Sequence, residues 1–256
     1  MRILILGDIV GRPGRNAVSD YLSAHSEEYQ IIIVNGENAA GGFGITDSIA
    51  VDLRRQGVDI ITSGNHIWKQ DSILSLLSEK NPFVIRPANY PPENPGKGWA
   101  VIEKGRLRIQ VINLQGRVFT DFSGDCPFRT AERIIDSTEA DVRIIDIHAE
   151  ATSEKIALAR YLDGKVTLIA GTHTHVQTAD EQVFPGGTAY ISDLGMCGSS
   201  AGVIGMEMNS SIARFTSGKY SRLTVAEGDR MVNGLELELN DDLSVKSLKR
   251  VNEYTG

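Results

Sequence analysis

The N-terminal third of the chain alternates short, almost wholly apolar segments with longer segments whose apolar residues recur at helical spacing. The apolar segments are rich in isoleucine and valine, which favour strands, and they lack the polar alternation of a half-exposed sheet. This pattern predicts βαβ units and therefore an α/β fold with a parallel sheet covered by helices. We expect strands at 2–7, 31–35 and 59–63, followed by helices at 16–28, 47–56 and 71–79.

The pattern changes after Phe83. Several prolines between 87 and 95 predict a loop rather than a central strand. The segments 99–103 and 108–113 predict a hairpin around Lys104-Gly105, and alternating leucines after Leu223 predict antiparallel edge strands. The sequence contains no repeat or flexible linker, so we expect a single domain over 1–256. Further strands are expected at 142–147, 166–170 and 189–192, with a helix at 153–162.

The net charge and the cysteine content indicate which binding partners and which cellular compartment to expect for this protein. The net charge of -7 argues against a general nucleic-acid binder, so we expect no stable nucleic-acid complex. Cys126 and Cys197 lie far apart without a CxxC partner, which indicates a reducing compartment. The apolar N-terminus is short and reaches Asp8 at once, so no signal peptide or membrane span is readable. We expect a cytoplasmic protein without a membrane partner, and a homo-oligomer is left open.

Polar side chains collect where the predicted strands end. The carboxyl ends of parallel strands meet at one edge of a sheet, and ligands bind in the crevice there. Four of the five histidines fall at these positions, which a random surface placement would not produce. The residues that we expect to converge are Asp8, Glu37, Asn38, Asn65, His66, His148, His173 and His175.

These residue types are typical of a metal centre. Carboxylate, carboxamide and imidazole groups suit divalent ions such as manganese, iron and zinc. Seven candidate ligands exceed one tetrahedral site and favour two ions roughly 3.5–4 Å apart, which activate a shared water and neutralise a phosphoryl group. Glu37 is suited to bridge two ions, and His66 beside Asn65 can donate a proton toward the leaving oxygen. The pattern predicts a metal-dependent phosphoesterase.

Each residue taken alone also has a structural explanation. Asp8 could cap a helix, and His148 could be a buried imidazole with satisfied hydrogen bonds. The glycine-rich segment 41–44 could approach a phosphate or form a flexible turn before the helix at 47–56, and it lacks a Walker lysine. His173 and His175 are harder to explain in this way, because alternate residues of a strand point to the same side. The joint order of the residues favours the metal centre.

At these positions the sequence resembles a known superfamily. Gly64-Asn65-His66 and Gly171-Thr172-His173-Thr174-His175 are similar to two motifs of the calcineurin-like metallophosphoesterases. Residues 7–15 and 35–46 resemble the opening blocks of the narrower YmdB-like bacterial branch, whose members act as phosphodiesterases on cyclic nucleotides. Val10 replaces the usual histidine of Asp-x-His, and Glu37-Asn38 replaces the usual bridging aspartate, as in the narrower branch. The resemblance covers nearly the whole chain.

The resemblance implies a calcineurin-like four-layer α/β/β/α sandwich of two mixed sheets. It also implies two divalent or mixed-valence metal ions, iron and/or manganese, with zinc as an alternative. His66 would donate a proton or position the scissile phosphate. The implied reaction is hydrolysis of small cyclic nucleotides, 2′,3′-cyclic species above all, by in-line attack of a metal-bridging hydroxide. One ion would be held by Asp8, Glu37, Asn38 and His175, and the other by Glu37, Asn65, His148 and His173.

Two other functions remain compatible with these residues. One is a metal-bearing regulatory protein that senses a nucleotide and has weak esterase activity, because no obvious substrate-selective segment accompanies the core. Slow turnover with tight nucleotide binding would distinguish it. The other is a metallo-hydrolase acting on amides or carboxylic esters, which a comparison of phosphate and carboxylic esters would identify.

Overall fold

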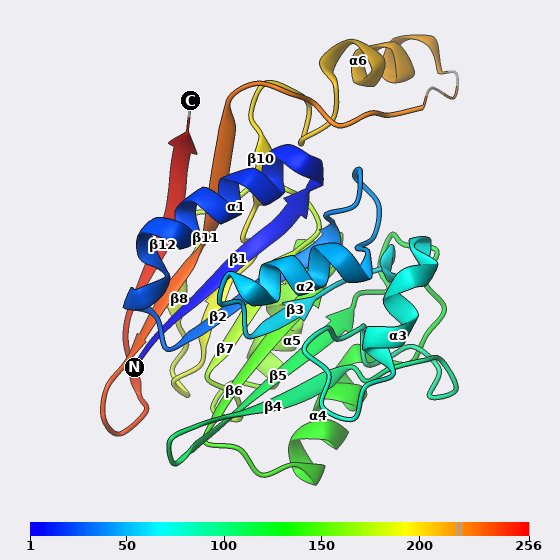
Figure 1. Cartoon of the computed structure of the whole chain (residues 1–256). Coiled ribbons are helices and arrows are strands. Elements are labelled where there is room, and N and C mark those ends of the chain that lie inside the picture. The colour runs from blue at the N-terminus through cyan, green and yellow to red at the C-terminus, as the bar shows by residue number, and fades with distance from the viewer. Residues whose placement is uncertain (219, 221, 256) are drawn as a thin grey trace.

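Two mixed six-stranded sheets form the centre of the computed structural model, which describes residues 1–218, 220 and 222–255 (Figure 1). The strand order of the first sheet is β12-β11-β10-β1-β2-β3, and that of the second is β4-β5-β6-β7-β9-β8. The first sheet contains β1 Arg2–Val10, β2 Ile31–Asn38, β3 Ile60–Thr62, β10 Met196–Ser199, β11 Arg230–Leu239 and β12 Val245–Thr255. The second contains β4 Trp99–Lys104, β5 Leu107–Gln115, β6 Val142–His148, β7 Leu168–Thr172, β8 Gln182–Val183 and β9 Ala189–Ile191.

Helices cover the outer faces of the two sheets. The first sheet is covered by α1 (Gly11–His25) and α2 (Asp47–Arg55), and the second by α4 (Pro127–Ser137) and α5 (Thr152–Tyr161) (Figure 1). A further helix, α6 (Met208–Ser217), projects from the upper end of the molecule in Figure 1. The remaining helical segments are short: α3 Leu74–Leu77 and the 3₁₀ turns Ser26–Glu28, Ile67–Lys69 and Asp71–Ile73.

The alternation of side chains along each strand produces three hydrophobic layers. In β1, Leu4 packs in the cluster that includes α1 and α2, whereas Ile3 packs between the sheets. In β6, Ile144 faces the first sheet and Ile145 joins the cluster beneath α4 and α5. Each sheet is covered by helices on one face and by the other sheet on its second face. Its strands therefore need apolar residues on both faces. The predicted α/β/β/α sandwich of two mixed sheets is confirmed.

Most of the predicted elements are present, with shifted ends. The helix expected at 71–79 is instead a 3₁₀ turn followed by the short α3. The antiparallel strands expected at an edge after Leu223 are β11 and β12, of which β12 is the outermost strand and β11 pairs with β1, β10 and β12. The polar residues that alternate with its leucines face outward, where Glu236 pairs with Arg2 at 2.9 Å. The prediction from sequence missed α4 and α6.

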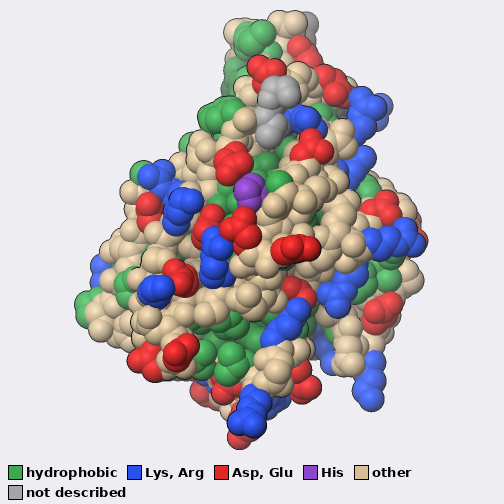
Figure 2. Space-filling view, turned by 60° about the vertical axis from the view of Figure 1, so that its left-hand side comes forward, with side chains coloured by type: hydrophobic (Ala, Val, Ile, Leu, Met, Phe, Trp, Pro, Cys, Tyr) green, Lys and Arg blue, Asp and Glu red, His purple; other side chains and the backbone are tan. Residues whose placement is uncertain are grey.

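The surface mixes charges of both signs. On the face shown in Figure 2, Lys and Arg side chains are interspersed with Asp and Glu, and hydrophobic side chains gather at the projecting upper end. Within the described ranges, no helix has the length and apolar character needed to cross a lipid bilayer.

The layer between the sheets should dominate stability. Ile33 of β2 is 1% exposed in this layer, so Ile33→Ala should lower the free energy of unfolding by about 2–5 kcal/mol. Urea denaturation of the purified protein measures the change. The matched control is Ile156→Ala on the surface of α5, where the side chain is 37% exposed and the expected change is within about 0.5 kcal/mol. Similar losses in both variants would contradict a tightly packed layer between the sheets.

Candidate functional site

The structure brings the predicted site residues together at the carboxyl ends of parallel strands, where the two sheets meet. His148, the last residue of β6, lies between two carboxylates of the first sheet. Its Nδ1 is 3.7 Å from Asp8 Oδ1, its Nε2 is 3.6 Å from Glu37 Oε1, and Nε2 is 3.1 Å from His173 Nδ1. A Cβ atom at Gly64 would come within 2.2 Å of the His148 ring, so this approach requires glycine.

Irregular backbone positions the carboxylate of Asp8. The strands β1 and β2 run past the predicted strand ends, and their register shifts on both sides of Asp8, which lies opposite Asn35. Such bulges re-aim a side chain without ending the pairing. His173 and His175 follow the end of β7 at Thr172, and both have positive φ angles, of 103° and 65°. Contrary to the prediction, these two histidines therefore do not share the face of a strand, since a strained turn after β7 places them at the site.

The two buried carboxylates each have one oxygen without a hydrogen-bond partner. Asp8 Oδ2 accepts the backbone N–H of His173 at 3.0 Å, and Glu37 Oε1 accepts that of His66 at 2.6 Å. Within the described residues, Asp8 Oδ1 and Glu37 Oε2 find no donor, although the residues are only 0% and 1% exposed. Burial raises the pKa of both carboxyl groups well above the usual range, and the repulsion by Asp193 adds to the effect at Asp8.

His175 and Asn38 form a second unusual contact. His175 Nδ1 lies 3.0 Å from the Ile204 carbonyl oxygen, which can only accept, so the proton of the neutral ring is on Nδ1. Asn38 Nδ2 donates to the Gly42 carbonyl at 2.8 Å, which turns its Oδ1 toward His175 Nε2 at 3.3 Å. Burial lowers the pKa of His175, and the neutral ring then leaves two acceptors facing each other. A cation between them would satisfy both.

A hydroxyl group holds the His148 ring in one orientation. Thr172 Oγ1 donates to Asp146 Oδ1 at 2.7 Å and therefore accepts the N–H of His148 Nδ1 at 3.0 Å. This leaves Nε2 of His148 as the acceptor, on the side of the ring that faces Glu37 and His173. Asp146 Oδ2 in turn accepts from Thr62 at 2.5 Å and Asn35 at 2.9 Å. Burial raises the pKa of Asp146 to about 6, while these three donors favour its ionised form.

His66 is held beside Glu37 by its own backbone and by its neighbours. Asn65 Nδ2 lies 3.5 Å from His66 Nδ1, a contact that favours the tautomer with its proton on Nε2. Burial, with a smaller contribution from Lys69, lowers the pKa of His66 to about 4, so the ring is neutral near pH 7. The Phe43 ring packs edge-on against it at 5.1 Å. The segment 41–44 thus forms a turn before α2 that supports His66.

The oxygen and nitrogen atoms that these side chains present fit metal ions. Among the described residues, no three His, Cys, Asp or Glu side chains are grouped as a ready-made cluster for a metal ion. The fit rests instead on two buried acceptor atoms without a donor, Asp8 Oδ1 and Glu37 Oε2, and on the part-buried acceptors His175 Nε2 and Asn38 Oδ1, which face each other. Buried acceptors without donors are costly, and a divalent cation would remove that cost.

Sequence reasoning missed several residues around the site. Asp146 and Thr172 are polar residues within mainly apolar strands. This polarity is the sequence signal that could have identified them as part of the site. Glu150, whose Oε2 lies 3.2 Å from His173 Nε2, follows His148 by two residues in the sequence. The aromatic residues Tyr90 and Phe122, which line a cavity next to Asn65 and His173, carried no recognisable motif.

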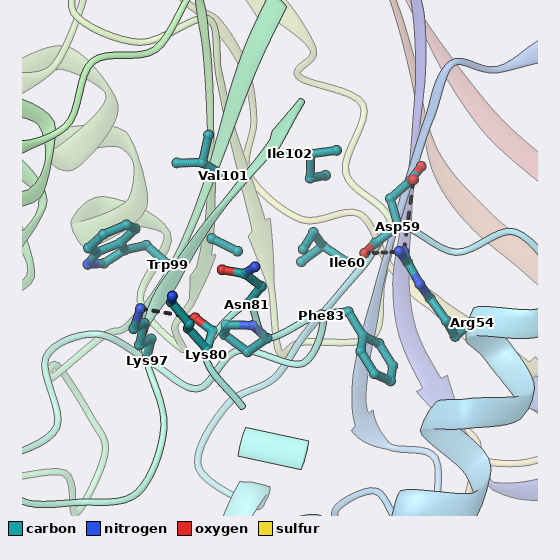
Figure 3. A pocket seen from close by; sticks show the side chains of 12 residues that line it. Arg54, Asp59, Ile60, Lys80, Asn81, Phe83, Lys97, Trp99, Val101 and Ile102 are labelled. Atoms are coloured by element: carbon teal, nitrogen blue, oxygen red, sulfur yellow. Dashed lines mark hydrogen bonds and ion pairs between the residues drawn. The ribbon is translucent and has the colours of Figure 1, made fainter. Parts of the chain in front are cut away.

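A second cavity of about 260 Å³ shares no lining residue with the one next to Asn65. It opens between α2 and the edge strands β3 and β4, where Phe83 and Trp99 flank it (Figure 3). Two of the three cations that line it are engaged by backbone carbonyls. Arg54 donates to those of Val58 and Asp59 at 2.9 and 2.8 Å. Lys97 Nζ likewise donates to the Lys80 carbonyl at 3.3 Å (Figure 3). We therefore place the functional site at the strand ends.

Known proteins match this chain over almost its entire length. A family model described as "YmdB-like protein" matches residues 4–251. The 2′,3′-cyclic-nucleotide 2′-phosphodiesterase of Bacillus subtilis (strain 168) is 44% identical over 255 residues, covering 97% of this chain and 95% of that protein. The crystal structure of a hypothetical protein from Thermus thermophilus has a TM-score of 0.96 at 38% identity and covers 100% of both chains. A novel phosphatase from Mycoplasma pneumoniae has a TM-score of 0.93 at 34% identity, covering 99% of this chain and 93% of its own.

The buried carboxylates should make the metal-free protein sensitive to pH. Because burial raises the pKa of Asp8 above its usual value of 3.8, its contribution to stability is present at low pH and is lost as pH rises toward the folded-state pKa. In the presence of EDTA, Asp8→Asn should therefore become more stable relative to the natural protein between about pH 5 and about pH 8. Urea unfolding at each pH measures the difference.

Added Mn²⁺ should reverse this order, because binding stabilises the natural protein more than the variant. The matched control is Asp136→Asn on the exposed surface of α4, which should show neither effect. An Asp8→Asn difference that is independent of pH and of Mn²⁺ would show that Asp8 is neither a destabilised carboxylate nor a ligand.

Proposed function

Because the chain belongs to the family of YmdB-like proteins, we propose that it is a phosphodiesterase that hydrolyses small cyclic nucleotides, 2′,3′-cyclic species above all. The observation that carries this proposal is the pair of buried carboxylates, Asp8 and Glu37, each of which has one oxygen without a hydrogen-bond donor. The activity of the Bacillus subtilis relative supports the substrate class. Residues from both sheets contribute to the site, so we propose that 1–256 acts as one domain.

We propose that the site holds two divalent or mixed-valence ions, iron and/or manganese, with zinc as an alternative. Bound ions of this kind supply an activated water and positive charge next to a phosphoryl group. The bare acceptor atoms and the fixed Nε2 of His148 support this assignment. One ligand set would be Asp8, Glu37, Asn38 and His175, and the other Glu37, Asn65, His148 and His173.

The protein's own groups have separable tasks in this proposal. His66 presents an Nε2–H that can donate to an oxygen of the phosphoryl or leaving group, while its backbone N–H stays on Glu37 at 2.6 Å. Thr172 and Asp146 hold the His148 ring and act as positioning residues. The apolar layers around the strand ends keep these rings and carboxylates from reorienting.

Hydrolysis of 2′,3′-cyclic AMP by the Mn²⁺-loaded protein tests the function. Removing a group that only hydrogen-bonds to a metal ligand typically lowers metal affinity or activity by about 10–100-fold. Because Glu37→Gln would remove a direct ligand, kcat/KM should fall by more than about 100-fold. The matched control is Glu103→Gln on the exposed part of β4, which should remain fully active. Undiminished activity in Glu37→Gln would refute the metal centre. Tight nucleotide binding without turnover by the natural protein would favour the regulatory function.

His66 should affect turnover rather than metal content. His66→Ala should lower kcat on the order of 10²–10³-fold, as expected when a neutral hydrogen-bond donor to the developing negative charge is lost, and plasma mass spectrometry should find its metal content unchanged. His66→Gln keeps an N–H donor but cannot transfer a proton, so partial recovery would identify a positioning role. Loss of bound metal from both variants would show instead that His66 is a ligand.

A further inference from the structure

A cavity of about 540 Å³ opens beside Asn65 and His173. This volume is within the usual range for small-molecule sites. Three aromatic side chains line the cavity, together with the hydroxyl-bearing Thr120 and Ser123 and the carboxylate of Asp121. The cavity therefore continues directly from the proposed metal centre into a region suited to a flat, partly polar group.

One wall of the cavity consists of interlocked aromatic rings. Tyr90 and Phe122 pack edge-to-face with ring centres 4.7 Å apart, and Tyr90 packs in the same way on Trp68 at 5.4 Å. Both Tyr90 and Phe122 are half-buried, so each ring keeps a surface that faces the cavity. Such edge-to-face contacts fix the ring planes and leave flat faces available to a ligand.

Hydrogen bonds fix both walls before any ligand binds. The buried Asn89, which precedes Tyr90, donates to the carbonyls of Gln115 and Asp125 at 2.8 and 3.0 Å and accepts the Gln115 N–H at 2.8 Å. The carboxylate of Glu154 accepts two successive backbone N–H groups, beginning with that of Arg117, at 3.0–3.1 Å. The segment 116–125 is thus held at both ends, which lowers the entropy cost of binding.

Phe119, in the middle of this segment, has an unusual backbone conformation and an unusually exposed side chain. Its side chain is 86% exposed, and its φ angle is 60°, in the left-handed region that non-glycine residues rarely adopt. An exposed aromatic ring on a strained backbone gains nothing for stability by itself, whereas strained residues cluster at binding sites. The ring lines the same cavity as Tyr90 and Phe122.

We propose that this cavity is a nucleobase subsite, in which the base of the substrate stacks on Phe119 against the wall formed by Tyr90 and Phe122. The inference rests on the proposed phosphodiesterase function, and it assigns base recognition to a segment outside the sheets. Every base offers a flat π-face, so stacking accepts different bases. The Ser123 hydroxyl can bond the base edge as donor or acceptor, and the Thr120 hydroxyl, which already donates to the Gly116 carbonyl at 3.1 Å, can accept from it. The phosphate would then lie toward Asn65 and His173.

Comparing two cyclic phosphodiesters tests the subsite. For the Mn²⁺-loaded full chain, Phe119→Ala should lower kcat/KM for 2′,3′-cyclic AMP by about 5- to 150-fold more than for glycerol 1,2-cyclic phosphate, which has no base. The loss should appear mainly in KM, and Phe119→Trp should restore most of it. The matched control is Phe215→Ala in α6, where the side chain is 82% exposed but lies outside the cavity. It should not change the ratio.

The outcomes separate this inference from the proposed function. If the natural protein hydrolyses both substrates but Phe119→Ala changes both equally or neither, the subsite is wrong and the phosphodiesterase stands. If the natural protein hydrolyses neither, calorimetric titration with adenosine 3′-monophosphate and glycerol 1-phosphate decides. Binding of the nucleotide that is tighter than that of glycerol 1-phosphate and depends on Phe119 supports the subsite. Binding that is absent or independent of Phe119 overturns it.

Discussion

Two carboxylates buried without enough hydrogen-bond donors are the constraint around which the strand ends are built. Asp8 and Glu37 each use one oxygen for a backbone N–H and leave the other bare in an almost fully buried position. In a stable fold such groups need compensation, since an uncompensated buried charge costs several kcal/mol. The apolar layers on both faces of each sheet must hold this arrangement in place until a cation or a proton compensates it.

Both sheets are needed for this arrangement. The first supplies the carboxylates through the bulged end of β1 and the extended β2, and the second supplies His148 from β6. Gly64 lets the His148 ring approach the carboxylates. The hydrogen bonds that link His148, Thr172 and Asp146 leave Nε2 of the ring as the acceptor beside Glu37. The chemistry is therefore placed on rigid strands, where small displacements of a ligand atom are resisted by dense packing.

Recognition of the substrate is separated from this rigid chemistry. The aromatic residues Phe119 and Phe122 belong to the connection between β5 and α4, not to a strand. Connections of this kind can change without disturbing the core, which is why specificity is commonly carried by loops on a fixed scaffold. Here Asn89 and Glu154 fix the connection, so base recognition would not require a large closing movement.

The sequence by itself determined the α/β architecture and the eight residues at the strand ends, because apolar periodicity and strand-end polarity are local properties. It could not determine that β11 is an inner strand or that β1 and β2 continue past Asp8 and Asn35. Nor could it place Asp146 with Thr172, or Tyr90 with Phe122, around one site. Only the tertiary structure decided these contacts, because strand pairing, bulges and side-chain packing join segments that are distant along the chain and leave no local pattern.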